Sequence, residues 1–209
     1  MIEILSPIFK GLMQLTGVLS IGLLLTLSFL DSDVKGGITN IKLVKKTKAF
    51  LLFWLLSTFA FVVIQISYLL QQPLASSFDL TVIRSYLTQT AIGKSYIVQI
   101  IGIIILFSIA LRRVITTYLC LLIGLIAIVA PVFQSHGSSS GRHGLAIGAL
   151  VIHVIALSFW VGGLFGLTQL NKEQKLIALP RFSELALWSA ITVVITGAAT
   201  AWTRLDSIE

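Results

Sequence analysis

The three histidines of the chain lie close together in the sequence. His136 and His143 belong to the stretch QSHGSSSGRHG, and His153 follows inside the apolar run LAIGALVIHVIALSFWVGGL. Imidazole is a ligand for copper, zinc, iron and nickel. The spacing H-x6-H-x9-H is not a standard zinc pattern, whereas three imidazoles suit Cu(II), and Met13 would add a soft thioether for Cu(I). We therefore expect a metal site formed by His136, His143, His153 and Met13.

A second interpretation of the same histidines stays open. The glycines and serines around His136 and His143 make that loop flexible, so metal binding must offset the loss of its conformational freedom. Without a metal, the two loop histidines would be solvated and His153 would be hydrogen-bonded to a neighbouring helix. An enzyme is not expected, because the sequence contains no G-x-S-x-G or H-E-x-x-H motif and no acid near Ser138–Ser140 to orient a histidine base.

The composition indicates the elements that must position these residues. Of the 209 residues, 56% are hydrophobic and 11% charged, whereas soluble domains average about 25% charged residues. A membrane span needs roughly 20 mostly apolar residues. We predict an all-α polytopic membrane bundle, a single domain over residues 1–209. Its six expected spans are 12–30, 50–70, 96–111, 114–133, 145–170 and 184–203.

The distribution of basic residues predicts the orientation of these spans. One side would carry ten of the 15 basic residues, and the other side would carry the remaining five. The ten are Lys35, Lys42, Lys45, Lys46, Lys48, Arg112, Arg113, Lys172, Lys175 and Arg181; the five are Lys10, Arg84, Lys94, Arg142 and Arg204. The basic-rich side of a membrane protein is cytoplasmic, so the N-terminus and the QSHGSSSGRHG loop should face out. The net charge of +7 needs no nucleic-acid partner to explain it.

Polar side chains inside the spans gather in the expected outer half. Gln14, Gln65 and Gln99 lie in the outer parts of the first three spans, and His153 lies eight residues into the fifth, about 12 Å deep. Such groups are costly in hydrocarbon, so we expect them to line a polar pocket roofed by the histidine loop. Alternatively, the glutamines only join helices by hydrogen bonds.

Helical spacing divides the fifth span into two faces. At 3.6 residues per turn, His153 and Trp160 share one face, so Trp160 is expected at the floor of the pocket. Gly162 and Gly166 form a GxxxG pair on the opposite face, where another helix can approach closely.

The longest outer connection contains a further helical pattern. Phe78, Val82, Ile83 and Leu87 recur at helical spacing. Either Ser77 or Asp79 is suited to cap this turn. We expect a short helix lying in the membrane interface.

The sequence also resembles the CopD family of bacterial copper-resistance membrane proteins. The helix H-x-x-A-x-x-x-W-V-G-G-L, here beginning at His153, is followed by R-F-S at residues 181–183 and by T-G at Thr196 and Gly197. The resemblance covers about residues 80–205 and is strongest over 135–205. Members usually continue with two or more further spans, so this chain resembles a relative that lacks the C-terminal helices.

The resemblance implies a function and a set of partners. The family is associated with moving copper across the bacterial cytoplasmic membrane, often beside a periplasmic copper-binding protein of the CopC type. It implies the ligands His136, His143 and His153, and a packing role for Gly197 in the last helix. A homo-oligomer or a partner membrane subunit also fits such a protein. The main alternative is a haem-binding or cytochrome oxidase assembly subunit, which would need a second imidazole facing His153. A further alternative is a structural subunit without a ligand.

Overall fold

The computed structural model describes residues 2–30, 40–109, 114–134 and 143–205. Within these residues every regular element is a helix, which confirms the predicted all-α class. The α-helices are α1 (Ile2–Leu25), α2 (Ile41–Leu70), α3 (Leu80–Gln89), α4 (Ala91–Ser108), α5 (Val114–Val129), α6 (His143–Leu157), α7 (Gly163–Thr168) and α8 (Lys172–Leu205). Short turns of other helical types are η1 (Thr26–Leu30), η2 (Leu74–Phe78), η3 (Ala130–Gln134) and η4 (Ser158–Gly162).

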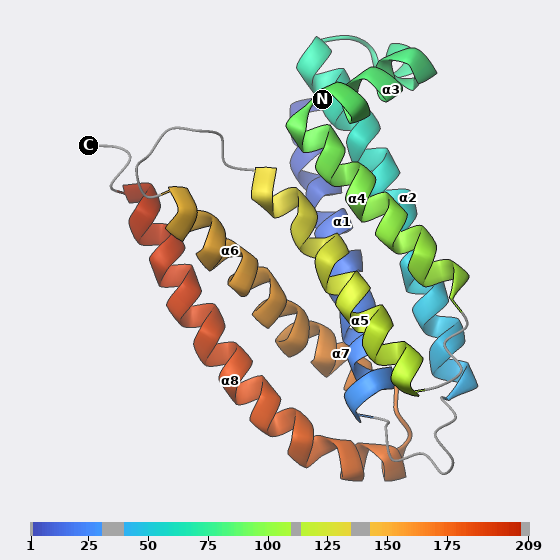
Figure 1. Ribbon diagram of the computed structural model, residues 1–209, viewed down its shortest axis with the longest axis vertical. Coiled ribbons are helices and arrows are strands. Elements are labelled where there is room, and N and C mark those ends of the chain that lie inside the picture. The colour runs from blue at the N-terminus through green and yellow to red at the C-terminus, as the bar shows by residue number, and fades with distance from the viewer. Residues whose placement is uncertain (1, 31–39, 110–113, 135–142, 206–209) are drawn as a thin grey trace.

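Six helical stretches are long and apolar enough to cross a membrane. They are Ile4–Leu30, Ile41–Leu70, Ala91–Ser108, Thr116–Phe133, Gly144–Thr168 and Lys172–Trp202. Each of them overlaps one of the six spans expected from the sequence, so the polytopic membrane bundle is confirmed. The largest difference is at the last span, where the helix begins at Lys172 and not at 184. A charged first turn ends an apolar pattern but not a helix, and α8 continues through Pro180, with a bend near its beginning (Figure 1).

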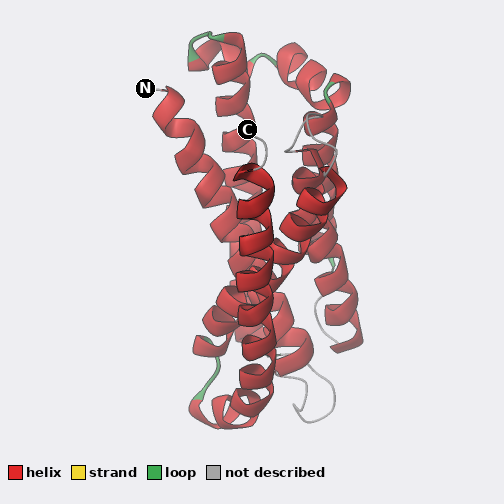
Figure 2. Cartoon of the chain, turned by 90° about the vertical axis from the view of Figure 1, so that its left-hand side faces the viewer, coloured by secondary structure: helices red, strands yellow, loops and turns green. Residues whose placement is uncertain are grey.

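The first span forms the centre of the bundle. Helix α1 packs against α2, α5, η4 and α7, and 72% of its most apolar window is buried, against 11% for each of the last two spans. Helices α6 and α8 are adjacent, and Figure 1 shows that this pair diverges from the other helices toward the end where α3 lies. Figure 2 shows the described chain as helices joined by short loops. The core therefore lies between α1, α2, α4 and α5, and the α6–α8 pair joins it mainly through η4 and α7.

Glycine permits the contact that joins the two parts. A Cβ on Gly22 of α1 would overlap the backbone of Gly162 in η4, and a Cβ on Gly162 would overlap the carbonyl oxygen of Val18. A Cβ on Gly166 would overlap the hydroxyl of Thr26. The GxxxG face expected to accept a close helix is thus the face on which α1 lies, backbone against backbone.

The predicted short helix between the second and third spans is α3. Asp79 is its N-cap, and the Asp79 carboxylate accepts a hydrogen bond from the backbone N–H of Thr81 at 2.8 Å. Of the two expected caps, Asp79 is therefore confirmed and Ser77 is not. Ser77 is buried in the preceding turn, η2.

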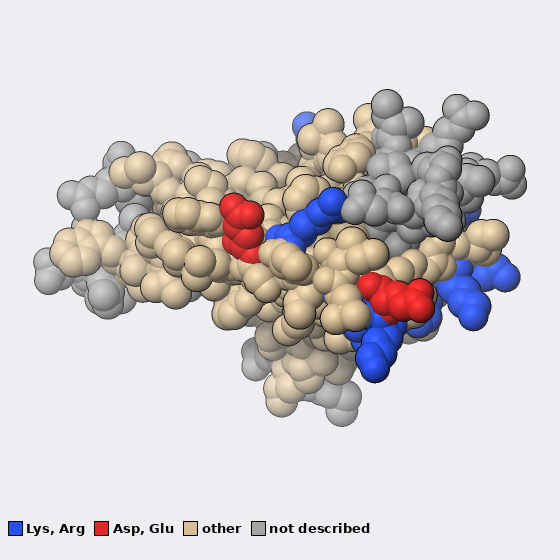
Figure 3. Space-filling model, turned by 90° about the horizontal axis from the view of Figure 1, so that it is seen from below, with Lys and Arg blue, Asp and Glu red and all other residues tan. Residues whose placement is uncertain are grey.

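The two ends of the bundle differ in charge. The end that carries the α1–α2 and α7–α8 connections is basic, as the view of this end in Figure 3 shows. Its described basic residues are Lys42, Lys45, Lys46, Lys48, Lys172, Lys175 and Arg181. The end near α3 has Lys10, Arg84 and Lys94. Both sets fall on the sides to which the sequence assigned them, and the orientation in a membrane stays a prediction.

Candidate functional site

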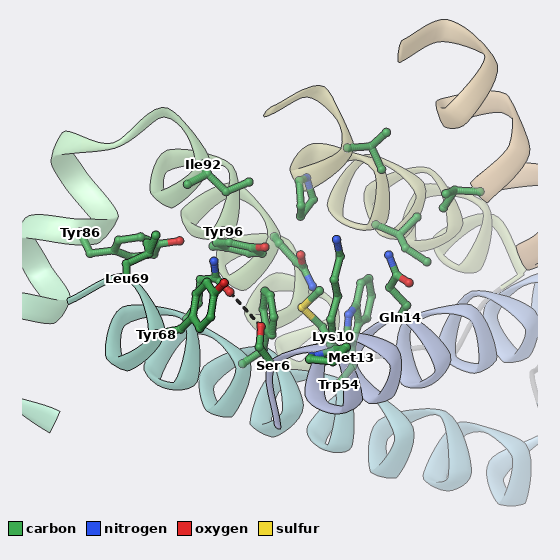
Figure 4. Close-up of a pocket in the computed structure, with 18 of the residues that line it drawn as sticks. Ser6, Lys10, Met13, Gln14, Trp54, Tyr68, Leu69, Tyr86, Ile92 and Tyr96 are labelled. Atoms are coloured by element: carbon green, nitrogen blue, oxygen red, sulfur yellow. Dashed lines mark hydrogen bonds between the residues drawn. The ribbon is translucent and has the colours of Figure 1, made fainter. Parts of the chain in front are cut away.

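A cavity of about 950 Å³ lies in the half of the bundle nearest α3. This volume is at the upper end of the range of roughly 300–1,000 Å³ that is typical of ligand pockets. The first half of α1, the second half of α2, α4 and the end of α5 form its walls, with α3 and α6 at its margins (Figure 4). Its lining consists of Ser6, Pro7, Lys10, Met13, Gln14, Trp54, Phe61, Gln65, Tyr68, Leu69, Tyr86, Ile92, Tyr96, Gln99, Ile128, Pro131, Val132, Leu150 and Val154.

Three buried polar atoms of this lining have no hydrogen-bond partner within the described residues. They are Trp54 Nε1, Tyr86 Oη and Gln99 Oε1. The side chains of Trp54 and Gln99 are 0% and 2% exposed. An orphaned buried polar group costs about 1–3 kcal/mol. The three atoms belong to residues that line one cavity, so a water or a ligand that reached them would offset this cost.

The hydrogen bonds of Thr58 determine which atom of the Gln99 amide has no partner among the described residues. Thr58 Oγ1 donates its single hydrogen to the carbonyl oxygen of Trp54 at 2.8 Å. The same hydroxyl must then accept from Gln99 Nε2, which lies 3.0 Å away. The amide nitrogen of Gln99 is thereby committed, and its oxygen Oε1 is the free acceptor.

The two orphaned donors come from different helices. The indole N–H of Trp54 can only donate, and the indole packs against Gly17, where an added Cβ would lie 2.9 Å from Trp54 Cε2. Burial raises the pKa of Tyr86, outside the spans, to about 12, so its phenol keeps its proton at neutral pH. Neither donor has an acceptor among the described residues, and Trp54 Nε1 itself lies against Gly17, 3.0 Å from where an added Cβ would stand.

One lining residue carries a charge, and it is Lys10. Its side chain points into the cavity, between Met13 and Gln14 in Figure 4. No Asp or Glu is among the described residues that line the cavity. The preceding acid on α1, Glu3, lies seven residues earlier, which is about 10 Å of helix rise. The cavity is therefore basic in character.

The structure brings together four of the residues singled out in the sequence. Met13, Gln14, Gln65 and Gln99 all line the cavity. Gln65 is held in place by Ser6, whose hydroxyl donates to Gln65 Oε1 at 3.1 Å. Lys10, Trp54 and the tyrosines were missed by sequence reasoning. A lysine within the first apolar span was the one signal that pointed to them, since a charge in a span is costly.

Trp160 does not line this cavity, contrary to the expectation that it forms the floor. Trp160 lies in η4, a π-helical turn that alters the 3.6 spacing after His153. His153 is itself outside the lining, so the face that the two residues were expected to share does not form a wall of the cavity.

His153 is also outside the cavity lining, although its neighbour Val154 is part of it. His153 Nδ1 lies 3.0 Å from Thr196 Oγ1 on α8. This contact is the helix-to-helix hydrogen bond left open as an alternative by the sequence. Gly197 lies beneath the ring, and a Cβ there would stand 3.6 Å from His153 Cε1, an ordinary van der Waals distance.

The bond to Thr196 also determines the tautomer of His153. Thr196 Oγ1 donates its hydrogen to the carbonyl oxygen of Thr192 at 2.6 Å. It must therefore accept from His153, so the imidazole proton is on Nδ1 and the lone pair is on Nε2. A metal-bound histidine commonly has this arrangement, with the second ring nitrogen donating to an oxygen.

The helix α6 separates two of the three histidines. His143 is the first residue of α6 and His153 is on the same helix, ten residues later. The rise between them is about 15 Å. Two imidazoles and two metal–nitrogen bonds of about 2 Å do not bridge this distance. His136 and the side chain of His143 lie outside the described residues.

No cluster of three or more His, Cys, Asp or Glu occurs among the described side chains. Met13 and His153 are thus two separate candidate ligands, one in the cavity and one between α6 and α8.

Comparisons with curated proteins and with solved structures find no match. A family match does exist, to the family described as copper resistance protein D-like, N-terminal domain, and it covers residues 1–145. This match includes all of the cavity walls contributed by α1 to α5. It covers more than half of the chain, and most of α6 together with α7 and α8 lies outside it. The chain belongs to the CopD-like family of copper-resistance membrane proteins.

Proposed function

We propose that this protein binds copper from the outer side of the bacterial cytoplasmic membrane and helps to move it across. The family match supports a role in copper handling. The six membrane-spanning helices supply the scaffold. Copper is here the cargo, and the residues proposed to contact it are histidines at two depths.

The observation that carries this proposal is the state of His153. Its Nδ1–H is held by Thr196, and no hydrogen bond to its Nε2 is recorded among the described residues. A neutral imidazole with an oriented lone pair is the form that binds copper. Because Thr196 fixes the ring, little rotational freedom would be lost when the metal arrives.

The distance along α6 makes the transfer stepwise. Copper first meets His136 and His143 at the outer end and then passes to His153, about 15 Å further along the helix. Met13 lies in the neighbouring cavity and offers a soft thioether to Cu(I). On this route the two loop histidines and His153 belong to separate sites. A periplasmic protein of the CopC type would deliver the metal.

The haem alternative gains no support from the described side chains. His153 faces Thr196 on α8 and not a second imidazole. A bis-histidine haem needs two imidazoles on facing helices.

The test is the copper content of purified, detergent-solubilised protein, measured by elemental mass spectrometry. We expect bound copper in the wild type and a loss of at least one equivalent in His153→Ala, because the imidazole supplies the ligand. Gly148→Ala is the matched control, since it lies on the same helix and an added Cβ meets nothing within 4 Å. Equal copper in wild type and His153→Ala, with both folded, would refute the ligand assignment.

A further inference from the structure

The cavity near α3 has a chemistry that copper alone does not explain. A copper ion is a cation, and the one charged group of the described lining is the ammonium of Lys10. Met13 offers Cu(I) a thioether in this cavity, but copper provides no partner for the ammonium of Lys10. The unpartnered indole N–H of Trp54 is a donor only and cannot coordinate a metal cation, and the phenol of Tyr86 keeps a proton that a metal cation cannot accept.

We propose that this cavity binds an anionic headgroup, a phosphate or carboxylate, carried on an apolar body. The ammonium of Lys10 neutralises the charge of the headgroup, and Trp54 and Tyr86 donate hydrogen bonds to its oxygens. Gln99 Oε1 accepts from a hydroxyl or N–H of the same ligand. This inference goes beyond the proposed transport of copper and uses none of the histidines.

The remaining lining fits the apolar body of such a ligand. It consists of aliphatic and aromatic side chains from four helices and from η3, namely Phe61, Leu69, Ile92, Ile128, Pro131, Val132, Leu150 and Val154. The cavity of about 950 Å³ holds a drug-sized molecule, or the headgroup of a phospholipid with part of its chains. With α3 lying in the membrane interface, as the sequence predicts, the cavity would open at the level of the lipid headgroups.

The position of Lys10 in the first span supports a role for its charge in ligand binding. Lys10 lies within the first candidate span, Ile4–Leu30. An ionisable residue within a span is expensive and is usually paired. Since the described cavity lining offers no carboxylate, the anionic headgroup of the ligand would be the partner of the Lys10 ammonium.

The experiment measures ligand-induced stabilisation of the full chain in a nonionic detergent after removal of lipid. Three probes separate the sources: dioctanoyl phosphatidylglycerol, dioctanoyl phosphatidylcholine and octanoate. We expect the melting temperature to rise with an anionic probe and not with phosphatidylcholine, which has the same chains but no net charge. A rise with phosphatidylglycerol alone identifies a bilayer lipid, and a rise with octanoate identifies a soluble carboxylate.

Lys10→Gln is the decisive variant, and Lys94→Gln is its matched control. Both lysines are exposed and lie at the same end of the bundle, but Lys94 does not line the cavity. We expect Lys10→Gln to weaken binding of the anionic probe by about tenfold or more, because a charge-assisted hydrogen bond is lost. Lys94→Gln should bind as the wild type does.

Two results would overturn the proposal: no stabilisation by either anionic probe, or equal binding by Lys10→Gln and Lys94→Gln. Trp54→Phe gives a second measurement, since it removes the indole N–H together with part of the ring, and binding of the anionic probe as tight as in the wild type would contradict the role of Trp54 as a donor. The copper assay is independent, because Lys10→Gln should keep its copper and His153→Ala should keep its anion. Failure of one proposal is therefore distinguishable from failure of the other.

Discussion

At the residue scale, two threonines decide the chemistry of two polar side chains. Thr196 gives its hydrogen to Thr192 and so makes His153 the donor at Nδ1. Thr58 donates its hydrogen to the carbonyl oxygen of Trp54 and so makes Gln99 the donor at Nε2. In both pairs a hydroxyl committed to its own helix backbone orients a side chain from another helix. The free atom, Nε2 in one case and Oε1 in the other, follows from this commitment.

The role of Thr196 can be measured separately from that of His153. Thr196→Val keeps the shape of the side chain and removes the acceptor for Nδ1–H. We expect copper affinity to fall by about 10- to 100-fold, as it does when the outer partner of a metal-bound histidine is removed. Thr192→Val is the control, since the Thr192 hydroxyl bonds the Trp188 carbonyl and not His153. A copper titration that gives the same affinity for both variants would contradict the role of Thr196.

At the element scale, the close crossing of α1 with η4 holds the α6–α8 pair to the core. Gly22 meets the backbone of Gly162 there, and a backbone cannot move aside as a side chain can. The π-helical turn at this crossing also changes the angular positions of the residues after it. The close backbone contact and the π-helical turn that contains Trp160 therefore occur at the same place in the chain.

Two alanine substitutions on α1 test this crossing. Gly22→Ala should destabilise the fold by about 1–3 kcal/mol or more, because the added methyl overlaps a backbone carbonyl. Gly11→Ala should be neutral or slightly stabilising, since nothing lies within 4 Å of its added methyl and alanine favours helix. Thermal unfolding in detergent provides the comparison. Equal melting temperatures for the two variants would show that the crossing is looser than described.

At the scale of the whole molecule, the charge difference between the two ends predicts its orientation in the membrane. The end with the α1–α2 and α7–α8 connections is basic and should face the cytoplasm. The cavity and α3 would then face out, which is the side from which copper is proposed to enter.

Single-cysteine labelling tests this orientation. Cys120, the one cysteine, is fully buried, and Cys120→Ser supplies the background. Thr88→Cys on α3 should react with a membrane-impermeant maleimide in spheroplasts, in which the cytoplasmic membrane is closed and the outer membrane has been removed. Lys45→Cys on α2 should react only after the membrane is opened. Both positions are exposed, so access alone decides the result. The reverse pattern would place the cavity on the cytoplasmic side.

Local sequence was enough to predict the class, the six spans and the α3 helix, with Ser77 and Asp79 both left as candidate caps, and to place Gln14, Gln65 and Gln99 in one half of the bundle. These follow from local hydrophobicity, capping chemistry and the depth of each residue along its helix. What each side chain faces depends on the tertiary structure. The face of the fifth span that was expected to carry His153 and Trp160 lies outside the cavity lining, and the continuous α6 separates His143 from His153. The angle of a residue around a helix depends on every turn before it and on the neighbouring helix. Lys10, Trp54, Tyr86 and Gln99 therefore meet only in the folded bundle.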